Sequence, residues 1–462
     1  MTTALAAATR AADGIDRTRD LNAVISHDRQ TLLDAARAAD ASPAPAPLRG
    51  MAVAVKDNIC TLEYPTTCAS RILEGYRSPY DATVIKRLRA AGAVIACKSN
   101  LDEFAMGAST EYSAYGRAKH PFDATRVPGG SSGGSAALVA AGVVDGALGS
   151  ETGGSVRQPA AFCGVVGVKP TYGRVSRYGL VAFGSSLDQV AVFGKTVDHA
   201  AKLLSVISGR DEHDATCADL DPLALEPPRR DLKGLVIGKP REYFPSDLDL
   251  VIRRACDRTL EQLKDAGATV RDVSLPHTGL AVPTYYVIAP AEASSNLARF
   301  DGVRYGPRRG DPRGDVKALY RATRGAGFGP EVRRRIIIGT YVLSAGYYDA
   351  YYGKAQAARA LIRRDFDRVF GDERVDLLFT PTTPSPAFRA GEKVDDPVAM
   401  YLADIFVCTA NLARVPALSV PIGRTNGLPI GGQLIGPEFS EARLLSVASL
   451  IESRVDGTAE VA

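Results

Sequence analysis

The sequence predicts an α/β protein built as one large unit. Short apolar runs typical of buried strands alternate with longer stretches in which apolar residues recur at helical spacing. A glycine- and serine-rich stretch at residues 128–164 interrupts this alternation, with the sequence PGGSSGGSAALVAAGVVDGALGSETGGSVRQPAAFCG. The 462 residues show no internal repeat and, beyond position 47, no Pro- or Gly-rich linker that would divide them.

The overall composition is that of an ordinary globular protein, with 45% hydrophobic and 23% charged residues. A net charge of +4 is too small to indicate nucleic-acid binding by itself. The seven cysteines are scattered without a CxxC pair, so we expect neither a disulfide framework nor a zinc site. Because the chain shows no signal peptide and no apolar run of about 18 residues, we expect a cytoplasmic protein without a membrane contact.

The N-terminal residues 1–40 have helical spacing, with apolar residues at Leu5, Ile15, Leu21, Leu32 and Leu33. The run ASPAPAP at 41–47 is typical of an extended linker. We therefore expect an N-terminal helical segment and linker, 1–47, that packs on a main domain spanning 48–462.

The main domain begins with a predicted strand at 51–55, which ends at Lys56. A helix at 81–92 and a strand at 93–97 follow, and the apolar run 136–148 reads as one buried helix. Residues 303–335 hold ten basic side chains against three acidic ones, which favours a solvated loop over a surface that faces RNA. The later predicted elements are strands at 235–238, 269–275, 377–380 and 417–421, and helices at 196–208, 248–266, 331–346, 348–370 and 441–453.

Two Gly-Gly-Ser clusters, at 129–131 and 153–155, flank the apolar run. Paired glycines let the backbone approach a ligand closely and leave N–H groups free to surround an anion. A serine beside such N–H groups is placed to attack a carbonyl group whose developing negative charge those donors stabilise. The stretch therefore predicts a site for nucleophilic catalysis.

A nucleophilic serine needs a base. The five histidines leave a Ser-His-Asp arrangement open, but the GxSxG match at 129–133 lacks the preceding strand of a nucleophile elbow and is a chance match. A lysine serves as base when burial lowers its pKa, and Lys56, Lys98 and Lys169 are candidates. Lys56 is favoured because it follows an entirely apolar strand.

The strand ending at Lys56, the GGSSGGS run at 129–135 and the GGSVRQP run at 153–159 together resemble the amidase signature family, and the resemblance extends over 48–453. It implies a single large domain whose mixed central β-sheet is covered by helices on both faces. It also implies that Ser155 is the nucleophile. Ser131, preceded by a cis peptide bond, would relay the proton of Ser155 to Lys56. The oxyanion hole would be formed by backbone N–H groups at Thr152, Gly153 and Gly154, with that of Ser155.

Within this family the chain most resembles the A subunits of glutamyl-tRNA(Gln)/aspartyl-tRNA(Asn) amidotransferases. That resemblance implies that Arg335 binds the α-carboxylate of glutamine and Asp404 its α-amino group, with Tyr286 in the same pocket; these roles match a guanidinium fork and a carboxylate. The stretches that carry it are SNLDEFAMG at 99–107, SSLDQ at 185–189, EASSNLARFDG at 292–302 and GYYDAYY at 346–352.

The implied function is hydrolysis of glutamine to supply ammonia. A B subunit would use ATP and Mg²⁺ to amidate the mischarged tRNA, and a small C subunit would complete a heterotrimer. The chain itself has no GxxxxGK[ST] loop, so we expect no cofactor in it. Whether the tRNA carries glutamate or aspartate stays open. The alternatives are a freestanding amidase of small amides and a non-catalytic scaffold that grips RNA through 303–335.

Overall fold

The computed structural model describes residues 3–43, 46–311 and 313–461. In these residues eleven strands form one sheet, which is mixed as the family resemblance implied. β2 lies parallel to β3 and β4, and β7 lies parallel to β8 and β9, whereas the other neighbours run antiparallel. In sheet order the strands are β1 (Val24–Ser26), β3 (Val94–Ser99), β2 (Ala52–Lys56), β4 (Gly146–Glu151), β6 (Gln189–Gly194), β5 (Val166–Lys169), β10 (Ala417–Thr425), β11 (Leu428–Ile435), β9 (Leu377–Pro381), β7 (Val236–Pro240) and β8 (Thr269–Val273).

Helices cover both faces of the sheet because its strands bury residues on both sides. In β2 the small residues Ala52 and Ala54 pack toward one helical layer, and Val53 and Val55 pack into the larger core on the other side. The first layer comprises α1 (Ala4–Arg17), α2 (Arg29–Ala41), α4 (Gly133–Ala140) and α5 (Arg157–Cys163). The second comprises α3 (Thr83–Ala90), α6 (Val197–Ile207), α7 (Leu250–Asp265) and α14 (Glu441–Arg454).

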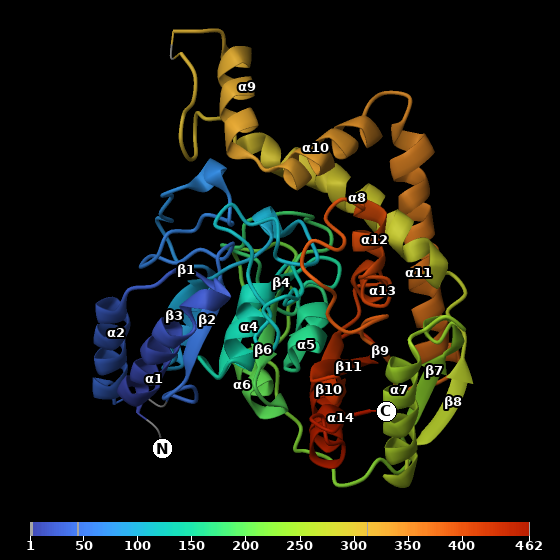
Figure 1. Cartoon of the computed structure of the whole chain (residues 1–462). Helices are drawn as coiled ribbons and strands as arrows, with labels where there is room; N and C mark the ends of the chain where they lie inside the picture. The colour runs from blue at the N-terminus through green and yellow to red at the C-terminus, as the bar shows by residue number, and fades with distance from the viewer. Residues whose placement is uncertain (1–2, 44–45, 312, 462) are drawn as a thin grey trace.

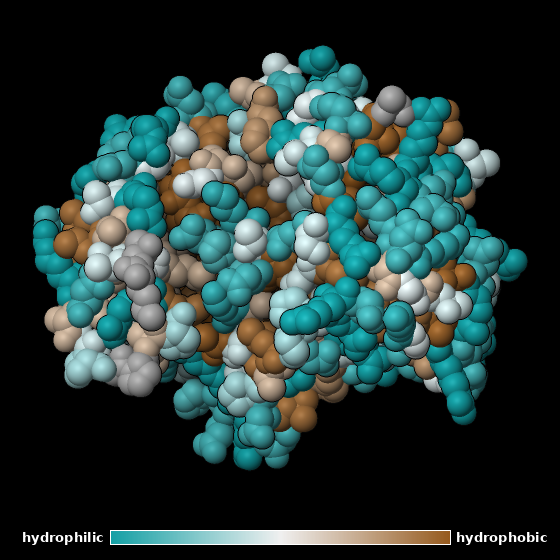
Figure 2. Space-filling model, turned by 90° about the horizontal axis from the view of Figure 1, so that it is seen from below, coloured by the Kyte–Doolittle hydropathy of each residue, from teal (hydrophilic) through white to brown (hydrophobic). Residues whose placement is uncertain are grey.

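The remaining helices form an arm above the carboxyl end of β2 and β4 (Figure 1). α10 packs along α8, and α11 packs against the same helix. At the opposite end of the molecule, the face seen in Figure 2 is mostly hydrophilic with small, scattered hydrophobic groups. The arm helices are α8 (Ala281–Asn296), α9 (Val316–Gly327), α10 (Pro330–Val342), α11 (Lys354–Asp367), α12 (Pro397–Leu402) and α13 (Cys408–Leu412).

The N-terminal segment differs from the prediction in one respect. It contains the short strand β1 between its two helices, and β1 pairs with β3 at the edge of the sheet. α1 and α2 share a core with β2 and β3. The expected division at residue 47 stays a prediction, since the linker 41–47 falls partly on residues 44–45, outside the described residues.

Two other expectations are wrong. The run 136–148 is not one helix: α4 ends at Ala140, Gly142 takes a left-handed conformation (φ +68°), and β4 starts at Gly146. Residues 303–335 are not a solvated loop throughout, because they contain α9 and the start of α10. The Asp315 side chain caps α9 by accepting a hydrogen bond from the N–H of Lys317.

Candidate active site

Lys56 and Ser131 lie in direct contact beneath the arm. Lys56 ends β2, and its Nζ donates to Ser131 Oγ at 2.7 Å and to the Ser150 carbonyl oxygen at 3.2 Å. Both side chains are fully buried. The Gly130–Ser131 peptide bond is cis, as the family resemblance implied. Two residues separated by 75 positions thus meet because the glycine-rich turn before α4 lies at the carboxyl end of β2.

Burial decides the charge state of this lysine. Desolvation lowers the pKa of Lys56 from 10.5 to about 7, and the negative charges of Asp102, Asp188 and Glu151 oppose the shift only partly. Near neutral pH a large share of Lys56 is therefore the neutral amine, which is able to accept a proton.

Ser155 lies in the second glycine cluster, between β4 and α5, and is 7% exposed. Its carbonyl oxygen accepts a hydrogen bond from the N–H of Ser132, which joins the two clusters. Gly154 has φ +135°, and a Cβ there would lie 2.2 Å from Val407 Cγ2. A Cβ on Gly153 would lie 2.5 Å from the ring of Tyr285. Only glycine fits these two positions, so the loop backbone packs directly against Val407 and Tyr285.

Two buried carboxylates hold the glycine loops in place. Asp188 accepts a hydrogen bond from Thr152 Oγ1 at 2.7 Å, and Asp102 accepts from the N–H groups of Ser109, Thr110 and Tyr112. Burial raises the pKa of each of these aspartates to about 6. Asp188 thus fixes Thr152 at the start of the second glycine cluster. Asp102 fixes the turn at 109–112, whose Thr110 Oγ1 donates to the Gly129 carbonyl oxygen of the first cluster at 2.7 Å.

Sequence reasoning did not single out these aspartates, although each lies in one of the stretches that carried the subgroup resemblance, SNLDEFAMG and SSLDQ. Their role depends on a fold that brings together residues far apart in the chain. Asp188 and Thr152 are 36 positions apart, so the sequence gives no sign of their contact.

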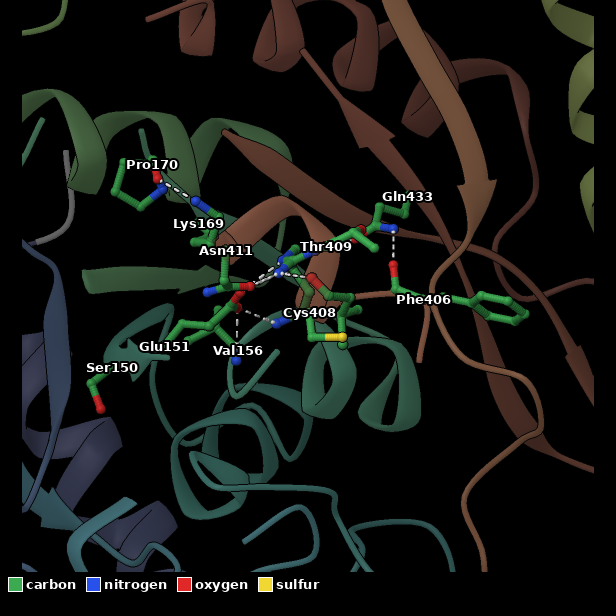
Figure 3. A network of polar contacts seen from close by, with 12 residues as sticks. Ser150, Glu151, Val156, Lys169, Pro170, Phe406, Cys408, Thr409, Asn411 and Gln433 are labelled. Carbon is green, nitrogen blue, oxygen red and sulfur yellow. Dashed lines mark hydrogen bonds and ion pairs between the residues drawn. The ribbon is translucent and has the colours of Figure 1, made fainter. Parts of the chain in front are cut away.

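A buried ion pair fixes the start of α5 behind Ser155. Glu151 and Arg157 are both fully buried and paired, and Glu151 Oε2 also accepts from the N–H groups of Val156 and Arg157 at 3.0 Å. Figure 3 shows Glu151 and Asn411 pointing toward the same centre, where the Arg157 guanidinium binds Asn411 Oδ1 at 2.6 Å. Each charge is compensated, so the pair anchors the turn without leaving an orphan charge.

The three substrate-binding candidates lie close together beside this loop. A Cβ on Gly154 would lie 3.3 Å from Asp404 Oδ1, a buried oxygen with no hydrogen-bond partner among the described residues. Burial raises the pKa of Asp404 well above its ordinary value. The guanidinium of Arg335 lies 5.2 Å from the ring of Tyr286, which packs edge-on against Tyr285. The fold therefore brings Arg335, Tyr286 and Asp404 to one side of the proposed oxyanion hole.

The other basic candidates have different partners. Lys98 pairs with Asp57 at 3.1 Å, and Lys169 donates to the Pro170 carbonyl oxygen at 2.7 Å. The buried His120 is hydrogen-bonded to the Phe162 carbonyl oxygen. Of the three lysines, Lys56 is the one in contact with a serine of the glycine clusters.

The described part of the chain offers neither a metal site nor a membrane span. It contains no group of three or more His, Cys, Asp and Glu residues arranged to hold a metal ion. None of its helices is both long and apolar enough to cross a membrane.

Comparison with known proteins places these features in a family. The amidase family model matches residues 6–445. The A subunit of the glutamyl-tRNA(Gln) amidotransferase of Carboxydothermus hydrogenoformans is 56% identical over 441 residues, 94% of this chain and 90% of that protein. The protein of the same name from Chloroflexus aurantiacus is 58% identical over 421 residues, 90% of this chain and 85% of that protein.

Solved structures agree with the sequence relatives. The crystal structure of the glutamyl-tRNA(Gln) amidotransferase A subunit from Thermotoga maritima superimposes with a TM-score of 0.81 at 45% identity, over 98% of this chain and 94% of that one. The peptide amidase from Stenotrophomonas maltophilia superimposes with a TM-score of 0.80 at 29% identity, over 97% of this chain and 93% of that one. The chain belongs to the amidase family.

Proposed function

We propose that this chain is the glutamine-hydrolysing subunit of a tRNA-dependent amidotransferase. Relatives of that name, at 56% and 58% identity over most of both chains, support the assignment. The observation that carries the chemistry is the buried contact between Lys56 Nζ and Ser131 Oγ beside the loop that holds Ser155.

In the proposed reaction the neutral amine of Lys56 accepts the proton of Ser131, which in turn accepts that of Ser155. Ser155 Oγ bonds to the carboxamide carbon of glutamine, and N–H groups of Thr152, Gly153 and Gly154, with that of Ser155, bind the oxyanion. The relay returns the proton to the amide nitrogen as the C–N bond breaks and ammonia leaves. Water then attacks the glutamyl ester and the same relay accepts its proton. The relay returns this proton to Ser155 Oγ as the ester bond breaks and glutamate leaves.

Glutamine would be held at its α-carbon end by Arg335, Asp404 and Tyr286. The unpartnered Oδ1 of Asp404 supports this role, since a buried carboxylate oxygen without a donor among the described residues matches a substrate ammonium group. A guanidinium beside it provides the complementary charge for the α-carboxylate. These charged groups would favour glutamine over amides that lack the α-substituents, because such amides leave the buried charges unpaired.

The proposed assembly is a heterotrimer with B and C subunits in the cytoplasm. The B subunit would bind the mischarged tRNA and use ATP and Mg²⁺, so this chain would need no cofactor. A ridge of exposed aromatic and aliphatic side chains on α10 and on residues 343–353 after it supports a protein contact. Large exposed apolar patches are typical of protein interfaces. The exposed ridge residues are Ile337, Ile338, Tyr341, Tyr347, Tyr348 and Tyr351.

The test is Ser155→Ala in the complex purified from its host. Ammonia release from glutamine should fall by ~10⁴-fold or more, because the nucleophile is lost. Amidation of mischarged tRNA from free ammonium should persist, since that reaction bypasses this site. Ser109→Ala is the matched control, because Ser109 Oγ is buried without a hydrogen-bond partner among the described residues.

Loss of both activities in a folded Ser155→Ala complex would contradict the assigned role. The mass of the native complex tests the assembly separately. One chain of similar size and one much smaller chain should co-purify in equal amounts. A lone chain that hydrolyses simple amides would instead identify a freestanding amidase.

A further inference from the structure

The guanidinium of Arg335 is held from its own helix. Glu331, one turn earlier in α10, accepts a hydrogen bond from Arg335 Nε at 2.7 Å, and the two side chains are 2% and 3% exposed. Because this contact uses Nε, the two terminal nitrogens of the fork remain for another acceptor. They make no hydrogen bond to any of the described residues. Burying a carboxylate costs free energy of folding unless the group is fully paired, so the buried position of Glu331 needs a reason.

Glu331 also contacts a tyrosine of a neighbouring helix. Its Oε1 accepts a hydrogen bond from the Tyr401 hydroxyl at 3.2 Å, from α12. The ring of Tyr401 stacks on that of Tyr286 with centroids 3.5 Å apart, and the Arg335 guanidinium lies 5.5 Å and 5.2 Å from these two rings. Glu331 therefore fixes both the cation and one of the rings that flank it.

The charge balance also fits a ligand. The second oxygen of Glu331, Oε2, is paired with Arg334, whose side chain is 41% exposed. Two guanidinium groups and one carboxylate leave a net charge of +1, which suits one substrate carboxylate. Without Glu331 the buried cation would lose its hydrogen-bond anchor and its fixed orientation, and a bidentate contact depends on orientation.

We propose that Glu331 is a positioning residue that orients the Arg335 fork toward the α-carboxylate of glutamine, with the Tyr401 hydroxyl as its second support. The inference rests on the proposed function and adds a determinant of substrate affinity that acts through Arg335. It concerns binding of the α-carboxylate and not the chemistry at Ser155.

The test is Glu331→Gln in the purified complex, with kcat and KM measured for glutamine and for 4-aminobutanamide, which lacks the α-carboxylate. KM for glutamine should rise about tenfold or more, with kcat changed less than about threefold. The kcat/KM for 4-aminobutanamide should stay unchanged. Asp367→Asn is the matched control, because it removes the carboxylate of an (i, i+4) pair with Arg363 that is exposed on α11.

Tyr401→Phe gives a second, milder variant that removes one hydroxyl and should raise KM for glutamine in the same direction. In an Arg335→Ala background, Glu331→Gln should add no further increase in KM, since its effect passes through Arg335. An unchanged KM for glutamine in both single variants, or an equal loss with both substrates, would overturn the inference. Failure of the wild-type complex to hydrolyse glutamine would instead overturn the proposed function.

Discussion

Replacing Lys56 with methionine should abolish catalysis and stabilise the fold. Burial lowers the pKa of Lys56 from 10.5 to about 7. At about 1.4 kcal/mol per pH unit, this difference disfavours the charged form in the native state by ~5 kcal/mol. Methionine fills a similar volume without a charge. It loses the hydrogen bonds to Ser131 and Ser150, at a cost of ~2 kcal/mol for the two.

The pH dependence of the stability gained by Lys56→Met identifies the cause of that gain. Below pH about 7, both the folded and the unfolded chain hold the proton, so the wild type carries the full penalty. Between about 7 and 10.5 the unfolded chain alone holds it, and wild-type stability rises by about 1.4 kcal/mol per pH unit. The advantage of Lys56→Met is therefore ~3 kcal/mol at pH 7 and falls steadily as the pH increases.

Urea unfolding of both proteins between pH 7 and 10 measures this difference, and ammonia release from glutamine measures catalysis. Lys169→Met is the matched control, because Lys169 is also fully buried with its pKa lowered to about 7 but bonds to the Pro170 carbonyl oxygen. It should gain stability with the same pH dependence and keep its activity. A stability difference that does not change with pH, or an active Lys56→Met variant, would refute the reasoning.

Three further results are expected. The kcat/KM for glutamine should rise about tenfold per pH unit up to pH about 7 and then level off, since neutral Lys56 is the base; a flat profile from pH 5 to 9 would speak against a titrating lysine. Gly154→Ala should lower kcat by ~100-fold or more with an unchanged circular dichroism spectrum, because its Cβ would lie 2.2 Å from Val407 Cγ2 and displace the oxyanion loop; normal turnover would show that the loop is not the oxyanion site. Ile337→Asp, at a side chain 68% exposed, should release the partner chains during gel filtration while glutamine hydrolysis persists; an intact complex would place the contact elsewhere.

The sheet is predictable from the sequence where its strands are short and apolar and where a glycine marks their start. The strands at 51–55 and 93–97 and the unit from 235 to 275 appear close to their expected limits, because Gly92 and Gly267 end the helices before the second strand of each pair. The prediction of one helix over 136–148 is wrong because a fully buried helix and a fully buried strand both look uniformly apolar. The local signals of the break are Gly142, which is left-handed, and the turn dipeptide Asp145-Gly146 at the start of β4.

The sequence predicts the glycine and serine residues of the site, but not the carboxylates that hold them and Arg335 in place. The two Gly-Gly-Ser clusters are local patterns, and the choice of Lys56 follows from the apolar strand before it. Asp102 and Asp188 act through contacts that only the fold creates. In the sequence, Glu331 looks like an ordinary surface charge of a basic segment. The partners of Asp102 and Asp188 come from other segments, so no spacing rule reveals them. Glu331 stands four positions before Arg335, a spacing that fits a helical ion pair, but the sequence does not show that the pair is buried or that it contacts Tyr401.

Trapping the acyl-enzyme tests the central claim most directly. The complex would be mixed with glutamine, quenched in acid within the first turnover, digested and analysed by mass spectrometry. The account predicts one added glutamyl group on the peptide that contains Ser155, and none on that peptide in the Ser155→Ala complex. A glutamyl group on any other residue, or glutamine hydrolysis that proceeds without a trapped ester, would contradict it.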